Sequence, residues 1–275
     1  MASYEIRPLQ LRILEILQTI DSVCKERGLR YYIIAGTLLG AVRHKGFIPW
    51  DDDLDIAMPR PDYEALKKNA SAWFPKHFEF INGEDDERFP FMFSKIQDDN
   101  TTLLERKHVK NLGGVFVDVF PLDGVPEKGW GRTLHFIKFS FYKKLKYFVY
   151  RDPFKHGKGI NSWIPRLCRK FVSKEYVHLK IKKLMLKYSF NDSKYVVDYD
   201  DSKRGIFPKE IFGDPKPILF EGVEVNGISK PHDYLAHKYG DYMVIPDGDH
   251  QIQHDFYLMD LNKSYHDQDI EELFR

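Results

Sequence analysis

Apolar residues recur at helical spacing near the start of the chain and then appear in shorter runs. From Leu11 to Val23 an apolar side chain returns every three or four positions, and the pattern stops at Gly28. This predicts an amphipathic helix, and a second helix is expected behind Pro61. Short apolar runs predict strands at 30–35, 53–56, 78–81, 91–96, 101–104 and 115–120. The order of these elements predicts an α+β domain with a mixed sheet.

The later half of the chain has a different pattern. Residues 128–188 mix apolar residues with lysine irregularly, which predicts helices with breaks at Pro153 and Pro165. A hairpin is expected over 219–227, with Asn226-Gly227 as a turn signal, followed by a helix over 234–239. We therefore divide the chain into a core (1–127), a basic helical segment (128–190) and a C-terminal segment that completes the site (191–275).

Candidate chemistry is concentrated just after the first predicted strand. Gly36 and Thr37 open a helix there, and the free N–H groups and dipole of a helix start form an anion site. Alternation along a strand then places Asp51, Asp53 and Asp55 on one face. Carboxylates two residues apart on a strand lie about 7 Å apart and can converge on a divalent cation. The combination predicts metal-assisted chemistry on a phosphate.

The aspartate run has two other interpretations. Such a run is often a solvated turn, but here Leu54 and Ile56 continue an apolar alternation that ties the acids to a buried strand. A calcium loop of the EF-hand kind needs glycine at the sixth position and glutamate at the twelfth, where this chain has Ile56 and Asp62. The sequence therefore favours a site built on a strand.

Further polar residues extend the candidate site. Asp118 stands alone in an apolar strand pattern, so it requires a partner, either the metal site or a buried ion pair with lysine or arginine. Arg43 and His44 end the short helix, where they either offset its dipole or neutralise a diphosphate. His250 and His254 have helical spacing, but a zinc site needs more ligands than this pair supplies.

The run from Gly36 to Met58 contains G-T-L-L-G, R-H-x-G-F-I-P-W and D-D-D-L-D-I. It resembles the signature of the LicD family of phosphotransferases, whose wider relatives include fukutin and the fukutin-related protein. Val115–Gly124 and Tyr234–Met243 are similar to two further segments of this family. The resemblance implies a nucleotidyltransferase-like fold, a mixed sheet with flanking helices, into which the basic helical segment is inserted.

The resemblance also implies a set of residue roles. Thr37 takes the phosphate-gripping place, Asp53 and Asp55 the metal-binding pair, and Asp118 the third acid. The metal implied is Mg²⁺, with Mn²⁺ as an alternative. Asp118 or Asp51 is then the expected acceptor of the attacking hydroxyl's proton.

The family further implies the substrates. The donor is expected to be a CDP-alcohol, with CDP-choline favoured over ribitol, glycerol or ethanolamine derivatives. The acceptor is expected to be a hydroxyl of a cell-surface glycan or of its lipid-linked precursor, and CMP leaves. Trp50, Tyr239 and Tyr242 are candidates for a cation–π cage around a quaternary ammonium. The alternatives are transfer of a nucleoside monophosphate and a non-catalytic protein that binds polyanions or membranes.

Composition and charge set the wider limits. The 275 residues are 43% hydrophobic, which allows a sizeable core, and the two cysteines lack a disulfide or zinc spacing. Charged residues interrupt any signal-peptide pattern near the start, so a cytoplasmic location is expected, at the inner face of a membrane in one interpretation.

The net charge of +1 hides an asymmetry, because residues 128–188 carry 17 basic and two acidic side chains. Three interpretations of these charges are open. They form the solvated face of a helical bundle, a surface for anionic lipid or a lipid-linked acceptor, or a nucleic-acid site. Nucleic acid is the least favoured partner, because no recognised motif accompanies the charge.

Overall fold

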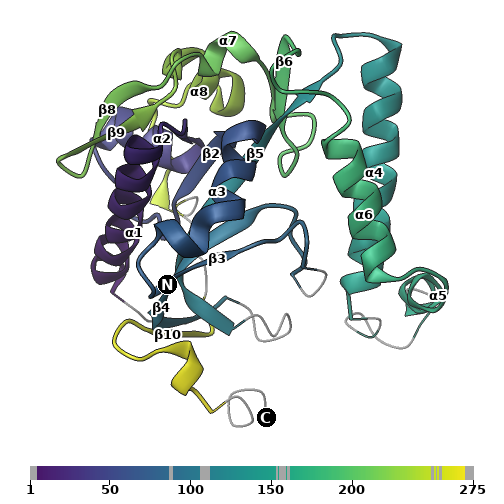
Figure 1. Cartoon of the computed structure of the whole chain (residues 1–275), viewed down its shortest axis with the longest axis horizontal. Helices are drawn as coiled ribbons and strands as arrows, with labels where there is room; N and C mark the ends of the chain where they lie inside the picture. Colours follow the sequence, from purple (N-terminus) through teal and green to yellow (C-terminus); the bar gives the residue numbers. More distant parts are fainter. Residues whose placement is uncertain are drawn as a thin grey trace. The chain divides into compact units, whose positions relative to one another are not determined.

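The computed structural model describes residues 5–86, 89–105, 112–152, 154, 159, 162–248, 251, 253 and 256–269. The chain forms two compact units. Unit 1 comprises Met1–Ile81, Ser94–Pro121 and Glu210–Arg275, and unit 2 comprises Asn82–Phe93 and Leu122–Lys209. The chain combines a curled sheet with helices, as Figure 1 shows, so the predicted α+β, nucleotidyltransferase-like class is confirmed.

Unit 1 is built on a curled sheet. Its neighbouring strands are, in order, β1 (Tyr32–Ile33), β2 (Asp55–Pro59), β5 (Leu112–Val125), β4 (Ser94–Leu104) and β10 (Leu258–Asp260). Strand β3 (Phe78–Ile81) also pairs with β4. The helices of this unit are α1 (Ile6–Arg27), α2 (Ala35–His44), α3 (Arg60–Trp73) and α8 (Pro231–Tyr239), and a short 3-10 helix, η4 (Tyr265–Asp267), lies near the end.

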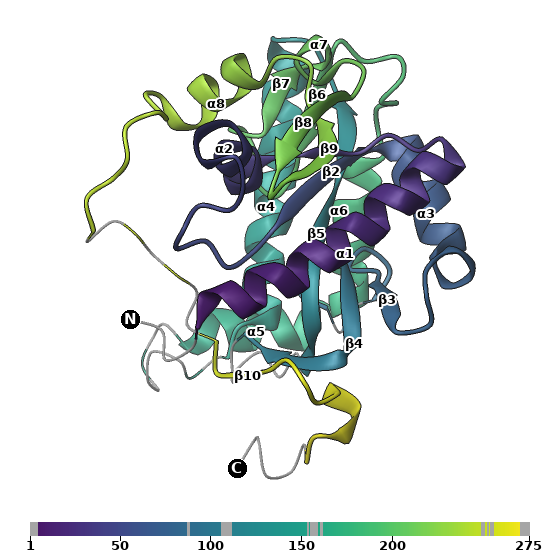
Figure 2. The same cartoon turned by 90° about the vertical axis from the view of Figure 1, so that its left-hand side faces the viewer.

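Helix α1 confirms the predicted amphipathic pattern. Its apolar residues Leu9, Ile13, Ile16, Leu17 and Ile20 are buried. Figure 2 shows the helix lying across the sheet. The helix ends at Gly28, whose φ of 65° lies in the left-handed region that glycine adopts without a steric penalty.

Strand β4 joins two stretches that the sequence predicted as separate strands. It pairs with β5 antiparallel, and a register shift between Asp98 and Leu103 marks an irregularity between the two predicted stretches. On the regular side of this irregularity Lys95 stands opposite Asp118. The pairing therefore places a cation directly beside the acid that the sequence left without an assigned partner.

Unit 2 contains the basic helices. They are α4 (Trp130–Tyr150), α5 (Trp163–Phe171) and α6 (Lys174–Met185). Strands β6 (Tyr195–Asp198) and β7 (Ile206–Pro208) continue antiparallel from the end of β5. The core of this unit includes Phe136, Phe139, Val177, Ile181, Val197 and Tyr199. Within the described ranges, no helix combines the length and the apolar character that crossing a bilayer requires.

Two predictions of local structure are wrong. The hairpin formed by β8 (Lys216–Phe220) and β9 (Val223–Gly227) turns at Glu221 and Gly222, with φ of 52° and 78°, whereas Asn226 and Gly227 pair within β9. A two-residue hairpin turn of type I′ has positive φ at both positions, which Gly222 adopts without a steric penalty. Pro165 does not break a helix, because it lies in the first turn of α5, where its missing N–H is tolerated. Pro153 lies outside the described residues.

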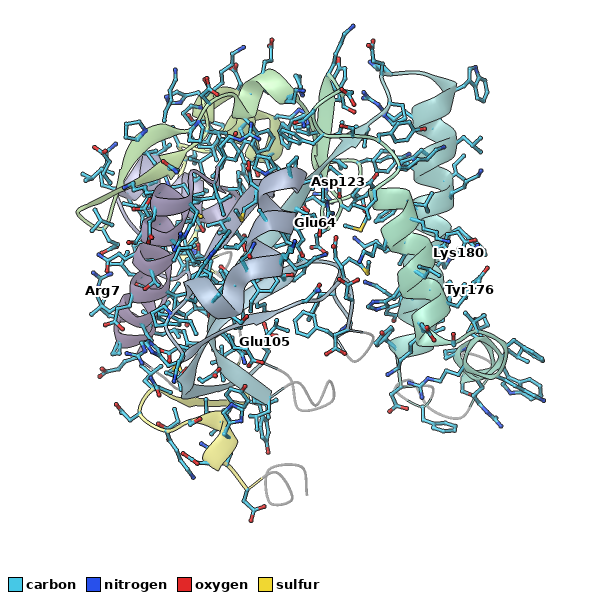
Figure 3. The ribbon with its side chains drawn as sticks, in the orientation of Figure 1. Arg7, Glu64, Glu105, Asp123, Tyr176 and Lys180 are labelled. Atoms are coloured by element: carbon cyan, nitrogen blue, oxygen red, sulfur yellow. The ribbon has the colours of Figure 1, made fainter. Side chains whose placement is uncertain are left out.

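The hairpin is tied to the first half of unit 1 through Glu221. This carboxylate accepts hydrogen bonds from Arg7 Nη2 on α1 at 2.5 Å and from the Phe47 backbone N–H at 3.0 Å. Arg7 is labelled on α1 in Figure 3. The short helix α7 (Lys209–Phe212) leads into the hairpin, and the Tyr31 hydroxyl accepts from the Asn226 N–H. The C-terminal part of the chain is thus fixed against the elements that carry the candidate site.

Helix α2 depends on a glycine at its centre. A Cβ on Gly40 would lie 2.4 Å from the backbone oxygen of Gly46, which no side-chain movement relieves. We expect Gly40→Ala to destabilise the protein by about 2 kcal/mol through this overlap, although alanine normally stabilises a helix interior. Urea unfolding measures the loss. Gly131→Ala in α4 is the control, because its Cβ meets nothing within 4 Å. Equal stability of both variants would contradict the close approach at Gly40.

Candidate active site

The segment between α2 and β2 folds back along α2. At the far end of the helix the Gly46 N–H donates to the Gly40 carbonyl at 3.4 Å. At the start of the helix the Asp55 N–H donates to Thr37 Oγ1 at 2.9 Å, and a Cβ on Gly36 would lie 2.9 Å from Asp51 Oδ2. This return path carries the aspartates to the N-terminus of α2, so the two predicted halves of the site lie together.

The start of α2 has a constrained backbone. Ala35 adopts φ of 49°, in the left-handed region, which costs a non-glycine residue about 1 kcal/mol. Its N–H donates to the Tyr234 hydroxyl at 3.3 Å, and the preceding Ile34 N–H donates to the Asp55 carbonyl at 3.1 Å. Backbone strain of this kind persists where the surroundings hold it, often at functional sites. Here α8 and β2 hold the turn that sets the direction of α2.

Three consecutive aspartates form the centre of the site. One carboxylate oxygen from each of Asp51, Asp52 and Asp53 lies within 4.8 Å of the others. Asp52 is only 3% exposed, and it was not among the predicted site residues, because the predicted strand alternation selected Asp51, Asp53 and Asp55. These residues precede β2, which begins at Asp55. The chain before the strand is therefore free of the strict alternation that a strand imposes, and adjacent carboxylates can gather.

Asp55 and Asp118 lie on neighbouring strands next to this centre. The Asp118 N–H donates to the Leu54 carbonyl at 3.0 Å, which brings β5 beside the start of β2. Burial, followed by the charges of Asp53 and Asp118, raises the pKa of Asp55 well above its usual value. Burial also raises the pKa of Asp118 to about 7, although Lys95 acts to lower it. The acids therefore interact electrostatically as one group.

Two lysines near the acids were not found by sequence reasoning. Lys95 Nζ lies 3.1 Å from Asp118 Oδ1 and 3.4 Å from Glu105 Oε1, so the ion-pair alternative for Asp118 is present within the acid group itself. Lys238 on α8 acts to lower the pKa of Asp55. Neither lysine has a signal in the sequence, because the register of β4 and the position of α8 decide their placement.

The remaining predicted site residues gather at the other end of α2. Arg43 Nη1 donates to the Tyr242 carbonyl at 2.8 Å, and Arg43 Nε donates to His44 Nε2 at 2.9 Å. The His44 and Trp50 rings meet edge to face at 6.3 Å. Burial and the Arg43 charge lower the pKa of His44. Trp50 thus contacts His44, His44 accepts from Arg43, and Arg43 donates to the backbone carbonyl of Tyr242.

Three other candidates lie elsewhere. Tyr239 ends α8, with Lys238 Nζ 5.9 Å from its ring centroid. His250 and His254 lie outside the described residues. The site therefore has an acidic part at the start of α2 and an aromatic and basic part at its end. A helix start beside clustered carboxylates is an arrangement typical of enzymes that transfer phosphate groups.

Comparison with known proteins agrees with this class. Residues 28–160 match the family model described as the LicD/FKTN/FKRP nucleotidyltransferase domain. Lipopolysaccharide cholinephosphotransferase LicD of Haemophilus influenzae is 29% identical over 272 residues, covering 92% of this chain and 97% of that protein. Ribitol 5-phosphate transferase FKRP of Homo sapiens is 42% identical over 52 residues, 18% of this chain and 10% of that protein. The chain is thus similar to LicD-family phosphotransferases, over residues 28–160 to the family's domain model and over nearly its whole length to one family member.

The contact between Gly36 and Asp51 tests the geometry of the acidic part. In Gly36→Ala the new Cβ has to displace the Asp51 carboxylate, which is the end of a flexible side chain and moves without unfolding the protein. We expect the affinity for Mn²⁺ to fall about tenfold, the loss of roughly one charged ligand contact. Calorimetric titration measures the affinity, and Asp51→Asn should weaken it similarly. Unchanged Mn²⁺ binding in both variants would exclude Asp51 as a ligand.

The ion pair between Lys95 and Asp118 should stabilise the fold. Lys95→Met leaves an uncompensated acid group in a buried position, and we expect a loss of about 3 kcal/mol in the free energy of unfolding. Part of this loss should return when Mg²⁺ is added, because a cation replaces the missing charge. Lys67→Met is the matched control, since Lys67 pairs with the partly exposed Glu64 and should contribute less than about 1 kcal/mol. Equal losses would argue against a special role for Lys95.

Proposed function

We propose that the protein transfers phosphocholine from CDP-choline to a hydroxyl of a cell-surface glycan or of its lipid-linked precursor, and releases CMP. The observation that carries this proposal is the aspartate cluster at the start of α2, in a chain similar over nearly its whole length to a lipopolysaccharide cholinephosphotransferase. Other CDP-alcohols are the alternatives for the donor. A second relative is named for ribitol 5-phosphate transfer, and it matches a much shorter stretch.

The acidic part fits a divalent cation. Asp51, Asp52 and Asp53 offer three oxygens within 4.8 Å of one another, and Asp55 and Asp118 interact electrostatically with the same group. Carboxylate and phosphate oxygens are the ligands that Mg²⁺ prefers, and Mn²⁺ accepts the same set. When bound, the cation neutralises charge that develops on the diphosphate. We assign Asp53, Asp55 and Asp118 as ligands, as the resemblance implies, and add Asp51 and Asp52.

The residues of the chain have defined roles in the proposed reaction. The N–H groups of Gly36 and Thr37 bind phosphate oxygens, because they lie at the positive end of α2. Thr37 Oγ1 already accepts from the Asp55 N–H, and its hydroxyl proton remains a donor for the substrate. The acceptor oxygen attacks the phosphorus distal to the nucleoside, a new P–O bond forms, and the P–O bond to CMP breaks.

The proton of the attacking hydroxyl goes to a carboxylate. We assign this role to Asp118 or Asp51. Asp118 lies on β5 beside the acids that precede and begin β2, and burial raises its pKa, which makes its carboxylate a stronger proton acceptor. Asp51 lies against the helix start that binds the phosphates, so it is the alternative.

The aromatic and basic part would bind the rest of the donor. Trp50 and Tyr242 in this part, together with Tyr239 at the end of α8, are the proposed cage for the choline group, and we assign Arg43 and His44 to the nucleotide. The division into a core (1–127), a basic segment (128–190) and a segment that completes the site (191–275) is part of the proposal. We place the protein in the cytoplasm, with peripheral membrane contact through 128–188 and without a nucleic-acid partner.

A single substitution tests the metal site. Asp53→Asn keeps the size of the side chain and removes its charge, so we expect release of CMP to fall by about 100-fold or more while thermal unfolding changes little. Asp192→Asn, on the exposed surface of unit 2, is the control and should keep full activity. Full activity of Asp53→Asn would rule out the proposed metal site.

The products separate the proposed reaction from its alternatives. The wild-type protein is incubated with CDP-choline, CDP-ethanolamine, CDP-glycerol, CTP and ATP, each with and without Mg²⁺. Thermal shift identifies the nucleotide that binds, because a ligand stabilises the folded state. Release of CMP from one CDP-alcohol supports the proposal. Release of pyrophosphate from a triphosphate assigns nucleotidyl transfer instead, and no binding across the panel favours a non-catalytic protein.

A further inference from the structure

Helix α4 has an apolar stripe on its outer face. The stripe consists of Trp130, Leu134, Ile137 and Phe141, whose spacing of four, three and four residues places them along one side of a helix. All four are exposed, and Trp130 is 90% accessible. The face that packs into unit 2 instead carries Phe136 and Phe139. A surface helix usually has one apolar stripe, which is buried. This helix has a second apolar stripe, and that stripe is exposed.

Helix α5 shows the same feature in a shorter form. Its exposed apolar residues are Trp163, Ile164, Leu167 and Phe171, and Phe171 is 74% accessible. Arg166 and Lys170 are exposed beside them. Only Pro165 is buried in this helix, and Cys168 is half-buried. The helix therefore presents most of its apolar surface to the outside, next to basic side chains.

Arg169 holds α5 against the end of α4. Its guanidinium donates to the carbonyl oxygens of Val149 at 2.9 Å, Tyr150 at 3.1 Å and Arg151 at 2.8 Å. These are the last carbonyls of α4, which carry the negative end of the helix dipole. Both apolar stripes thus belong to one fixed part of unit 2. We call the eight exposed apolar residues of α4 and α5, with their neighbouring lysines and arginines, the outer surface of unit 2.

The segment that carries α4, α5 and α6 is strongly basic. Residues 128–188 hold 17 basic and two acidic side chains. On α6, Tyr176 and Lys180 form a cation–π pair with Nζ 5.2 Å from the ring centroid, and both are labelled in Figure 3. Large apolar residues beside lysine and arginine are typical of helices that lie in a membrane interface, where the apolar groups enter the lipid and the cations meet anionic headgroups.

We propose that the outer surface of unit 2 binds the face of a bilayer that contains anionic lipid. Exposed apolar stripes on two helices indicate an interaction site, and the charge decides between the partners. A second copy of this chain that docked through the same surface would bring equally basic side chains into contact, and the two surfaces would repel each other. An anionic bilayer supplies both a negative surface and an apolar interior. The binding itself does not depend on the proposed reaction, but its purpose, access to a lipid-linked acceptor, rests on the proposed function.

Vesicle sedimentation with the full chain tests the proposal. The protein is mixed with vesicles of phosphatidylcholine alone and with vesicles in which about one third of the lipid is phosphatidylglycerol. We expect binding to the anionic vesicles and at least tenfold weaker binding to the neutral ones. Binding should also weaken when NaCl is raised from about 0.1 M to about 0.5 M, because salt screens the charges.

Two kinds of variant separate the contributions. Trp163→Ser with Phe171→Ser removes apolar surface from α5, and Arg166→Glu with Lys170→Glu reverses its charge. Each pair should weaken binding to the anionic vesicles at least tenfold. The matched control is Leu219→Ser, because Leu219 is an exposed apolar residue of β8 in unit 1 and should leave binding unchanged. Thermal unfolding checks that each variant is folded.

Three results would overturn the proposal. The first is no binding of the wild-type protein to anionic vesicles, and the second is an equal loss of binding in Leu219→Ser. The third is a dimer of the wild-type protein in light scattering that the α5 variants convert to a monomer, which would assign the surface to a second copy. None of these results depends on the CMP assay, so the membrane proposal and the proposed reaction fail separately.

Discussion

Mutual repulsion among the carboxylates is the constraint on which the rest of unit 1 depends. Three aspartates place oxygens within 4.8 Å of one another, and two more acids on β2 and β5 add to the same field. At this distance two unit charges repel by about 3 kcal/mol for an effective dielectric constant near 20. That is a large fraction of the stability of a typical domain. The surrounding fold has to hold the acids together against this repulsion, and the repulsion in turn favours whatever cation binds there.

Backbone contacts supply most of the restraint. The Asp55 N–H to Thr37 hydrogen bond, the Ile34 N–H to Asp55 carbonyl bond and the Asp118 N–H to Leu54 carbonyl bond fix the chain immediately after the cluster. Lys95 compensates part of the charge from the adjacent strand. Gly40 allows the segment before the acids to return close to α2. The site is therefore rigid because hydrogen bonds and close packing hold it, even though its charges oppose one another.

Much of this organisation could be predicted from the sequence, because local patterns determine it. The periodicity of α1, the helix opened by Gly36 and the acidic run before β2 are each signals within a short stretch of the chain. Lys95 could not be predicted, because its place opposite Asp118 depends on the register between β4 and β5. Asp52 was missed because a local rule was applied beyond the strand to which it belongs. The strand begins at Asp55, so the alternation assumed for residue 52 does not apply. Local rules fail where pairing between distant segments decides the geometry.

The distribution of charge connects the two units to a common function. Residues 128–188 hold 17 basic and two acidic side chains, so this segment has a large positive net charge. The rest of the chain has a nearly equal negative net charge, and the total of +1 conceals these two opposite charges. The acidic site alone would be repelled by an anionic membrane or by an anionic glycan. A separate basic unit with exposed tryptophan and phenylalanine side chains supplies the attraction that the catalytic unit lacks. Membrane binding and phosphate chemistry therefore lie in different units. Each unit can then keep the charge that its task requires.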